Sequence, residues 1–452
     1  MEKSGAERRR GVVLVPYPFQ GHITPMLQLA SILHSKGFSI FIAHTQFNSP
    51  NPSSHPDFTF LPLSDHLTAA DTSFYNLLNA HSIMNKNCKA PFEKYMGEMQ
   101  EHVACIIYDS IMNFVDVVAN HLNIPTIVLR TNTAAYMHSH FAVFQLLEQN
   151  LIPLPESQLE EAVPKAYPLR YKDLPLSASI EIPEVVLDFI RSYMDIRSSS
   201  AVIWNTIDMV DHEPLQKLQH HWQVPFFTIG PFHKIVPPEL PTSLMEEDNS
   251  CLSWLDKQAP DSVIYVSLGS LAIINEKELT EMASGLAQSK QPFLWVLRPS
   301  LLNGSKEATE YLREDFQNKT REQGLIVKWA PQKKVLAHRA VGGFLTHCGW
   351  NSTLESICEG VPLICRPCFS DQNVNARYVT YVWRVGLELE NVSERSIERA
   401  INTLMVGEEG KKLRQRAIHM KKEIEHSINS GGSSYESLNC LVDFINSLSG
   451  TK

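Results

Sequence analysis

Residues 329–372 gather side chains that could hold a charged ligand carrying a flat ring. A Gly-Trp-Asn-Ser turn at 349–352 lies between an expected strand, 341–346, and an expected helix, 352–358. Backbone N–H groups and small polar side chains at the start of a helix favour an anion such as a diphosphate. Any one of these residues could instead be a helix cap or a core residue, so the interpretation depends on the whole segment.

Other residues of the segment suit the remaining parts of a nucleotide sugar. Trp329 follows an expected strand and could stack on a planar base, and His347 adds a hydrogen-bond donor for the anion. Glu355 is an acceptor suited to ribose hydroxyls, while Asp371 and Gln372 suit sugar hydroxyls. Neither a G-x-G-x-x-G nor a G-x-x-x-x-G-K-[ST] loop occurs, which disfavours the dinucleotide and P-loop classes. The segment therefore predicts a nucleotide-sugar site.

A possible acid–base pair lies far from this segment. His22 follows Gly21 at the start of an expected helix, where the partial positive charge favours the neutral imidazole that a general base needs. Asp109 stands at the carboxyl end of a buried strand, and if both strands are central the two side chains overhang one sheet edge. A surface turn histidine and a helix-capping aspartate are the alternatives. Because no G-x-S-x-G elbow occurs, the pair would activate a nucleophile brought by the substrate.

The elements that must position these residues follow a repeated α/β pattern, which predicts parallel sheets. Expected strands of the first half lie at 12–17, 39–43, 58–63, 103–107, 124–129, 201–205 and 225–229. Those of the second half lie at 263–267, 293–297, 325–328, 341–346 and 385–389, with helices at 276–289, 393–404 and 408–428 and a last amphipathic helix after 431–434. A Pro-rich acidic linker at 230–249 separates the halves, and the Pro-rich region 151–183 is typical of a variable pocket wall.

The composition limits which classes of partner and which compartment are expected. With 40 Lys+Arg against 49 Asp+Glu the net charge is -9, which argues against nucleic acid. The charged first ten residues and the lack of about 18 consecutive apolar residues predict a cytoplasmic protein without a signal peptide or membrane insertion. The eight scattered cysteines indicate free thiols, with a zinc site at Cys365 and Cys368 as the weaker alternative.

The motifs resemble one family over nearly the whole chain. Residues 329–372 are similar, almost position for position, to the signature box of plant secondary-product UDP-glycosyltransferases. The resemblance includes PFQGH, IIYD, WLDKQAPDSVIYVSLGS at 254–270, FLWVLRP at 293–299 and GGSSYESL. FQGHITPMLQLASILHSKGFSI together with HTQFN is most similar to the group-76 branch.

The resemblance implies a GT-B fold, in which two Rossmann-like domains face each other across a cleft. It implies an acceptor domain at 1–232, a linker at 233–250, a UDP-sugar domain at 251–434, and a C-terminal helix at 435–452 that returns to the first domain. It also implies an inverting, metal-free reaction in which His22 is the base and Asp109 its partner. The closing Gln of the box resembles members that use UDP-glucose.

The resemblance also implies the roles of the donor-binding residues. Uracil is stacked on by Trp329 and contacted at its edge by the Ala330 backbone, and the ribose is held by Gln332 and Glu355. The diphosphate is bound by His347, Gly349, Asn351 and Ser352. The sugar is held by Trp350, Asp371 and Gln372, and two further donor-contacting positions are Ser270 and Thr131.

The resemblance further implies that the acceptor is a small plant metabolite, an aglycone or a glycoside, which attacks the donor sugar through a hydroxyl, carboxyl or amine group. Its pocket is expected from residues 64–100, 130–140 and 151–200, with Tyr136, His138 and His140 as candidates. The chain is expected to act as a monomer without an organic cofactor. A sugar-nucleotide epimerase and a catalytically silent UDP-sugar binder are the alternatives, and the intact His22 and Asp109 disfavour the silent binder.

Overall fold

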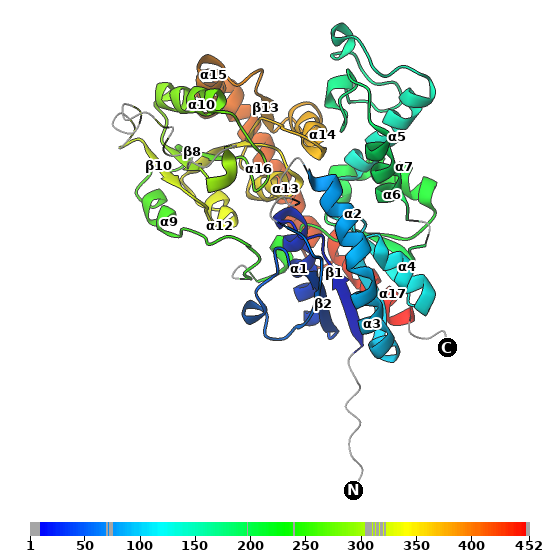
Figure 1. Ribbon diagram of the computed structural model, residues 1–452. Coiled ribbons are helices and arrows are strands. Elements are labelled where there is room, and N and C mark those ends of the chain that lie inside the picture. The colour runs from blue at the N-terminus through cyan, green and yellow to red at the C-terminus, as the bar shows by residue number, and fades with distance from the viewer. Residues whose placement is uncertain are drawn as a thin grey trace. The chain divides into compact units, whose positions relative to one another are not determined.

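The computed structural model describes residues 10–448 except 69–70, 72–75, 197, 238–239, 303–309, 311, 313–315, 317–319 and 321. The predicted N-terminal residues 1–9, linker residues 238–239 and helix residues 449–452 lie outside this description. The chain forms two compact units, each with its own parallel sheet (Figure 1). The first comprises Met1–Ala134, Ile182–Leu244 and Ser427–Lys452, and the second Ala135–Glu181 and Met245–His426. No helix among the described residues is long and apolar enough to cross a membrane.

The described part of the first unit contains a seven-stranded sheet in the order β3-β2-β1-β4-β5-β6-β7, with every pair parallel. Strands β1, β5 and β6 are mostly apolar and are buried along their whole length, as expected where helices cover both faces of a sheet. The strands are β1 (Gly11–Val15), β2 (Ser39–Thr45), β3 (Thr59–Leu63), β4 (Val103–Asp109), β5 (Thr126–Arg130), β6 (Ala201–Trp204) and β7 (Phe226–Thr228).

Helices of the first unit separate and follow these strands along the chain. They are α1 (Gln20–Ser35), α2 (Leu77–Asn87), α3 (Lys89–Met99), α4 (Phe114–Leu122), α6 (Glu184–Met194), α7 (Asp208–Trp222), α8 (Phe232–Ile235) and α17 (Ser433–Leu448). Gly37 takes a φ of 95° just after α1, the left-handed conformation that a glycine adopts without strain. The last helix, α17, contacts β4 and β7 and buries Leu438, Leu441 and Ile445 in the core of this unit.

The described part of the second unit contains a six-stranded parallel sheet in the order β10-β9-β8-β11-β12-β13. The strands are β8 (Val263–Ser267), β9 (Phe293–Val296), β10 (Gly324–Val327), β11 (Val341–Thr346), β12 (Leu363–Cys365) and β13 (Gly386–Glu388). Its helices are α5 (Ala134–Glu148), α9 (Ser250–Leu255), α10 (Glu276–Ser289), α12 (Gln332–Leu336), α13 (Trp350–Glu359), α14 (Asp371–Arg377), the π-helical turn η8 (Tyr378–Val382), α15 (Glu394–Met405) and α16 (Glu408–Ile428). Two parallel sheets of this kind confirm the predicted class of two Rossmann-like domains.

The elements differ from their expected limits in three instructive places. Helix α1 already begins at Gln20, so His22 lies inside its first turn rather than at its start, and the backbone N–H of Ile23 bonds to the carbonyl of Phe19. Helix α13 begins at Trp350, two residues earlier than expected. Helix α5 is not predicted by the sequence, because most of its residues are buried or half-buried and its apolar residues follow no amphipathic period. The predicted domain limits at 232 and 250 stay a prediction.

Candidate active site

His22 and Asp109 lie side by side in the first unit. His22 is the third residue of α1, which follows β1, and Asp109 is the last residue of β4, which pairs with β1. The sheet order reverses between these two strands, and ligands of parallel sheets bind outside such a point. His22 Nδ1 is 2.7 Å from Asp109 Oδ2, and the two side chains are 26% and 3% exposed.

The surroundings of Asp109 fix how the imidazole is oriented. The backbone N–H of Ile111 donates to Asp109 Oδ1 at 3.1 Å, and Thr131 Oγ1 is 3.1 Å from His22 Nδ1. Tyr17 packs edge-on to the His22 ring at 5.2 Å, and its own burial, with the nearby Asp109 charge, raises the pKa of the Tyr17 hydroxyl. His22 Nε2 has no hydrogen-bond partner in the described part of the chain. A neutral imidazole that donates from Nδ1 to Asp109 therefore presents the lone pair of Nε2 to an incoming proton.

The residues of the candidate donor site follow strand ends of the second unit. Ser270 comes after β8, Trp329 and Ala330 after β10, and His347 and Gly349 between β11 and α13. The carboxyl ends of neighbouring parallel strands share one edge of a sheet, and the strand order of this unit reverses between β8 and β11. Trp329 is half-buried, and its carbonyl accepts from the backbone N–H of Asp248 at 2.9 Å, so the segment before α12 is anchored.

Glu355 is a buried carboxylate held by an amide. Gln332 Nε2 donates to Glu355 Oε2 at 2.8 Å and to Ser352 Oγ at 3.0 Å. Glu355 is 8% exposed, and burial raises the pKa of its carboxyl to about 7, although the Gln332 hydrogen bond opposes the shift. A strong acceptor of this kind suits vicinal hydroxyl groups.

His347 is wedged between two glycines. A Cβ atom on Gly269 or on Gly349 would come within 2.5 Å of the imidazole, and Gly269 also takes a φ of +71°. Burial, followed by the charges of Arg298 and Arg366, lowers the pKa of His347 to about 4. The imidazole is therefore neutral at pH 7, and it stands beside the N-terminus of α13, where Gly349 is the N-cap.

Asp371 and Gln372 open α14 after a strained turn. Ser370 has a φ of 58° and a ψ of -129°, a conformation that favours glycine. Gln372 Oε1 accepts from the backbone N–H groups of Cys368 at 2.8 Å and Phe369 at 3.1 Å. Asn375 Nδ2 donates to Asp371 Oδ2 at 2.8 Å, so both side chains are held in fixed orientations.

The three acceptor candidates all lie on α5, which groups with the second unit. The Tyr136 hydroxyl is 2.9 Å from Ser370 Oγ, immediately before Asp371. His140 is buried, with Nδ1 at 3.0 Å from the Tyr136 carbonyl, and its ring packs edge-on to Tyr136 at 4.6 Å. His138 packs at 6.3 Å from the Phe141 ring. The structure thus brings Tyr136, but not His140, to the turn that leads into the sugar-binding candidates.

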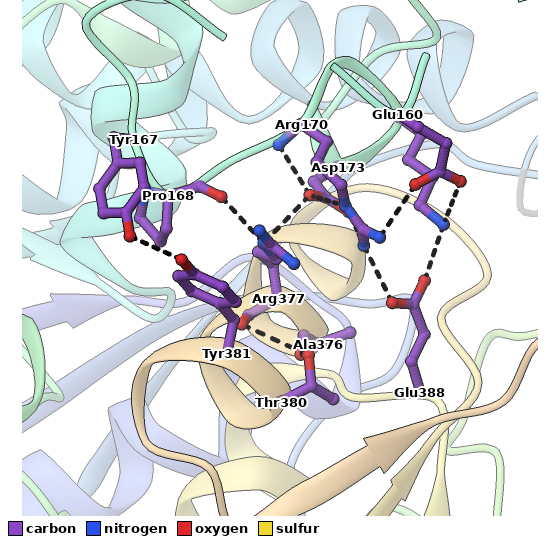
Figure 2. Close-up of polar contacts among 11 residues, drawn as sticks. Glu160, Tyr167, Pro168, Arg170, Asp173, Ala376, Arg377, Thr380, Tyr381 and Glu388 are labelled. Atoms are coloured by element: carbon purple, nitrogen blue, oxygen red, sulfur yellow. Dashed lines mark hydrogen bonds and ion pairs between the residues drawn. The ribbon is translucent and has the colours of Figure 1, made fainter. Parts of the chain in front are cut away.

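A polar network that the sequence analysis missed joins residues 160–173 to 377–388 (Figure 2). Arg170 bonds to Asp173 at 2.8 Å and to Glu388 at 2.9 Å. Arg377 Nε, on α14, donates to the Pro168 carbonyl at 2.8 Å, and its guanidinium lies over a tyrosine ring of η8. The Pro-rich segment is thereby fastened to the helix that Asp371 begins. No local pattern could reveal these contacts, because the partners are separated by about 200 residues.

No group of three or more His, Cys, Asp or Glu residues in the described ranges could hold a metal ion. All eight cysteines are described and are free thiols, and Cys365 and Cys368 belong to no metal-binding group among the residues that the structure describes.

The chain is similar to known proteins over nearly its whole length. The family model for UDP-glucoronosyl and UDP-glucosyl transferase matches residues 57–426. UDP-glycosyltransferase 76E1 of Solanum lycopersicum is 53% identical over 98% of this chain and 94% of its own length. Flavonol 3-O-glucosyltransferase UGT76E12 of Arabidopsis thaliana is 45% identical over 97% of this chain and 98% of its own.

A solved structure shows the same architecture. The structure of Phytolacca americana UGT2, complexed with UDP-2fluoro-glucose and pterostilbene, matches with a TM-score of 0.82 at 28% identity. The match covers 97% of this chain and 100% of that protein, so the similarity includes both units.

Proposed function

Because this chain belongs to the UDP-glycosyltransferases, in their plant group-76 branch and with their GT-B fold, we propose that it transfers glucose from UDP-glucose to a small metabolite. His22 is the general base of this reaction and Asp109 its partner. The 2.7 Å contact between His22 Nδ1 and Asp109 carries the proposal, since it leaves Nε2 to take a proton from the acceptor.

The second unit holds the donor. Trp329 stacks on uracil and the Ala330 backbone reads its edge, while Gln332 and Glu355 hold the ribose. The diphosphate is bound by His347, Gly349, Asn351 and Ser352, and the glucose is held by Trp350, Asp371 and Gln372. Ser270 completes the contacts of the second unit. By resemblance, Thr131 of the first unit also falls at a donor-contacting position. The neutral His347 and the N-terminus of α13 suit the anionic diphosphate, and the buried Glu355 carboxylate suits the ribose hydroxyls.

The proposed reaction is a single displacement with inversion. As the acceptor oxygen attacks the anomeric carbon, its proton passes to His22 Nε2, and Asp109 stabilises the imidazolium that forms. UDP leaves from the opposite face, so an α-linked donor gives a β-glucoside. His347 and the N–H groups of α13 stabilise the charge that develops on the leaving diphosphate. The protein's own groups thus supply the base and the leaving-group stabilisation without a metal.

The acceptor is proposed to be an aromatic metabolite with a free hydroxyl group. UGT76E12 is named for action on a flavonol, and Phytolacca americana UGT2 was solved with pterostilbene. Tyr136, which reaches the turn before Asp371, is the acceptor-side residue with the best support, while the placement of His138 and His140 in the pocket rests on resemblance. We further propose that the enzyme acts as a cytoplasmic monomer, with the domain limits given above.

Incubation with UDP-glucose and a mixed panel of hydroxylated aglycones, followed by mass spectrometry, tests the proposal. A glucoside is expected, and NMR of its anomeric proton should show the β linkage. A changed sugar nucleotide without acceptor would identify an epimerase instead. UDP-glucose binding without any product across the panel would favour the catalytically silent binder.

A further inference from the structure

Arg298 is a buried cation surrounded by neutral groups. It follows β9 and is only 3% exposed. Its Nε donates to the Gly269 carbonyl at 2.9 Å, its Nη1 to Ser300 Oγ at 2.6 Å, and its Nη2 to the Ala272 carbonyl. No carboxylate among the described residues forms an ion pair with it.

A buried charge without a counter-charge is unfavourable, because the low dielectric of the interior penalises the ionised form. Burial accordingly lowers the pKa of Arg298 to about 10, which still leaves the guanidinium charged at pH 7. The neighbouring Arg366 is treated differently, since its Nη2 pairs with Glu278 Oε1 at 2.5 Å. The charges of both arginines act on His347. Arg366 has a carboxylate partner, whereas Arg298 has none among the described residues.

The contacts of Arg298 fix the direction of the 269–272 turn. The Gly269 carbonyl points toward the guanidinium, and in a trans peptide the N–H of Ser270 points the opposite way. That N–H has no partner in the described part of the structure. Gly269 itself lies against the His347 imidazole, where a Cβ would come within 2.5 Å, and Gly349 at the start of α13 contacts the same ring. The turn, the imidazole and the helix N-terminus thus form one surface that is suited to an anion.

We propose that Arg298 is a positioning residue for the donor diphosphate: it fixes the 269–272 turn with Ser270 toward the phosphates, and the diphosphate balances its charge. This inference rests on the proposed donor site beside His347. The guanidinium acts through the backbone of the turn and through its field, so no direct contact with the donor is required.

Calorimetric titration with uridine, UMP and UDP tests the inference, because uridine shares the base and ribose but lacks the phosphates. Arg298→Gln keeps an amide donor and removes the charge. It should lose about tenfold or more of its UDP affinity while its uridine affinity stays within about twofold of wild type. Arg298→Lys keeps the charge and loses the fork, so its UDP preference should fall between those of wild type and Arg298→Gln.

Arg366→Gln is the matched control, since it removes a nearby arginine that already has its carboxylate partner. Its ratio of UDP to uridine affinity should equal that of wild type. If Arg298→Gln keeps the wild-type ratio of UDP to uridine affinity, even with both affinities reduced, the inference is overturned while the proposed function is left intact. A wild-type protein that binds no UDP would instead overturn the proposed function. If Arg298→Gln does not fold, Arg298→Lys decides, and a wild-type ratio in that variant overturns the inference.

Discussion

Replacing Glu355 by glutamine should stabilise the second unit at pH 8 and weaken its binding of the nucleoside. Glu355 is 8% exposed and has Gln332 as its hydrogen-bond partner, with no cation paired to it in the described residues. An ionised carboxylate in that setting destabilises the folded chain, whereas an amide of nearly the same shape does not. If Glu355 binds the ribose, its replacement should raise the free energy of unfolding and lower the affinity for the nucleoside.

The magnitude follows from the pKa. Burial raises the pKa of Glu355 from 4.5 to about 7. Because the folded state then binds the proton more tightly than the unfolded state, stability falls as the pH rises from 4.5 through 7. One pKa unit corresponds to about 1.4 kcal/mol, so the ionised carboxylate costs about 3 kcal/mol above pH 7. Glu355→Gln should therefore match wild type near pH 4.5 and exceed its free energy of unfolding by about 3 kcal/mol at pH 8.

Urea unfolding followed by tryptophan fluorescence between pH 4.5 and 8 measures this difference, and the variant-minus-wild-type value removes the effects of other titrating groups. Glu359→Gln is the matched control on the same helix, because Glu359 has a cationic partner, Lys421, at 3.2 Å. The control should show no gain at pH 8. A Glu355→Gln protein that is no more stable than wild type at pH 8 would refute the reasoning.

The functional half of the prediction uses uridine, which has no phosphate to titrate. The ribose hydroxyls donate best to the ionised carboxylate, so the uridine affinity of wild type should fall as the pH drops below about 7. Glu355→Gln should bind uridine about tenfold more weakly at pH 8, with little pH dependence. Pocket residues shared by both proteins cancel in this comparison. A uridine affinity that the substitution leaves unchanged would argue against ribose binding by Glu355.

Three further predictions follow from the site. His22→Ala should lose about 10²–10⁴-fold in kcat while UDP affinity stays nearly unchanged, and near-normal turnover on a hydroxyl acceptor would contradict its role as base. Trp329→Ala should weaken both uridine and UDP binding by about tenfold or more, the size of one base–aromatic stack; equal Kd values by calorimetry would contradict stacking. Arg377→Ala should speed hydrogen exchange in residues 160–173 and lower stability by about 1 kcal/mol, whereas Arg384→Ala, whose Nε bonds within the 381–384 turn, should not.

The proximity of His22 and Asp109 could be predicted because its signals are local, while their role as an acid–base pair stays a prediction. A histidine after a short apolar strand and an aspartate at the end of another are both visible in the sequence, and parallel sheets bring such ends together. The structure adds the pairing of β1 with β4, which makes the two strands neighbours across the reversal of strand order. Sequence patterns could not supply that neighbour relation, because residues 16–102 lie between the two strands.

The network around Arg170, Asp173, Arg377 and Glu388 could not be predicted. Each of its charged residues is ordinary in the sequence, and their contacts form only when the Pro-rich segment folds onto α14 (Figure 2). Arg298 was visible inside the FLWVLRP motif, but its significance depends on burial and on the absence of a described carboxylate partner. Charge balance in three dimensions is a property that spacing along the chain does not encode.

The two buried charges of the second unit support a common conclusion. Folded proteins ordinarily pair their buried ions, yet here an arginine has neutral partners and a carboxylate has an amide. The arginine belongs to the turn beside His347, where we propose that the donor places its diphosphate, and Glu355 is the residue that we propose for the ribose hydroxyls. A UDP-sugar would satisfy both at once, so the same electrostatics that destabilise the empty unit favour the complex. Saturating UDP should therefore raise the unfolding temperature of wild type more than that of Arg298→Gln, because stabilisation by a ligand grows with its affinity.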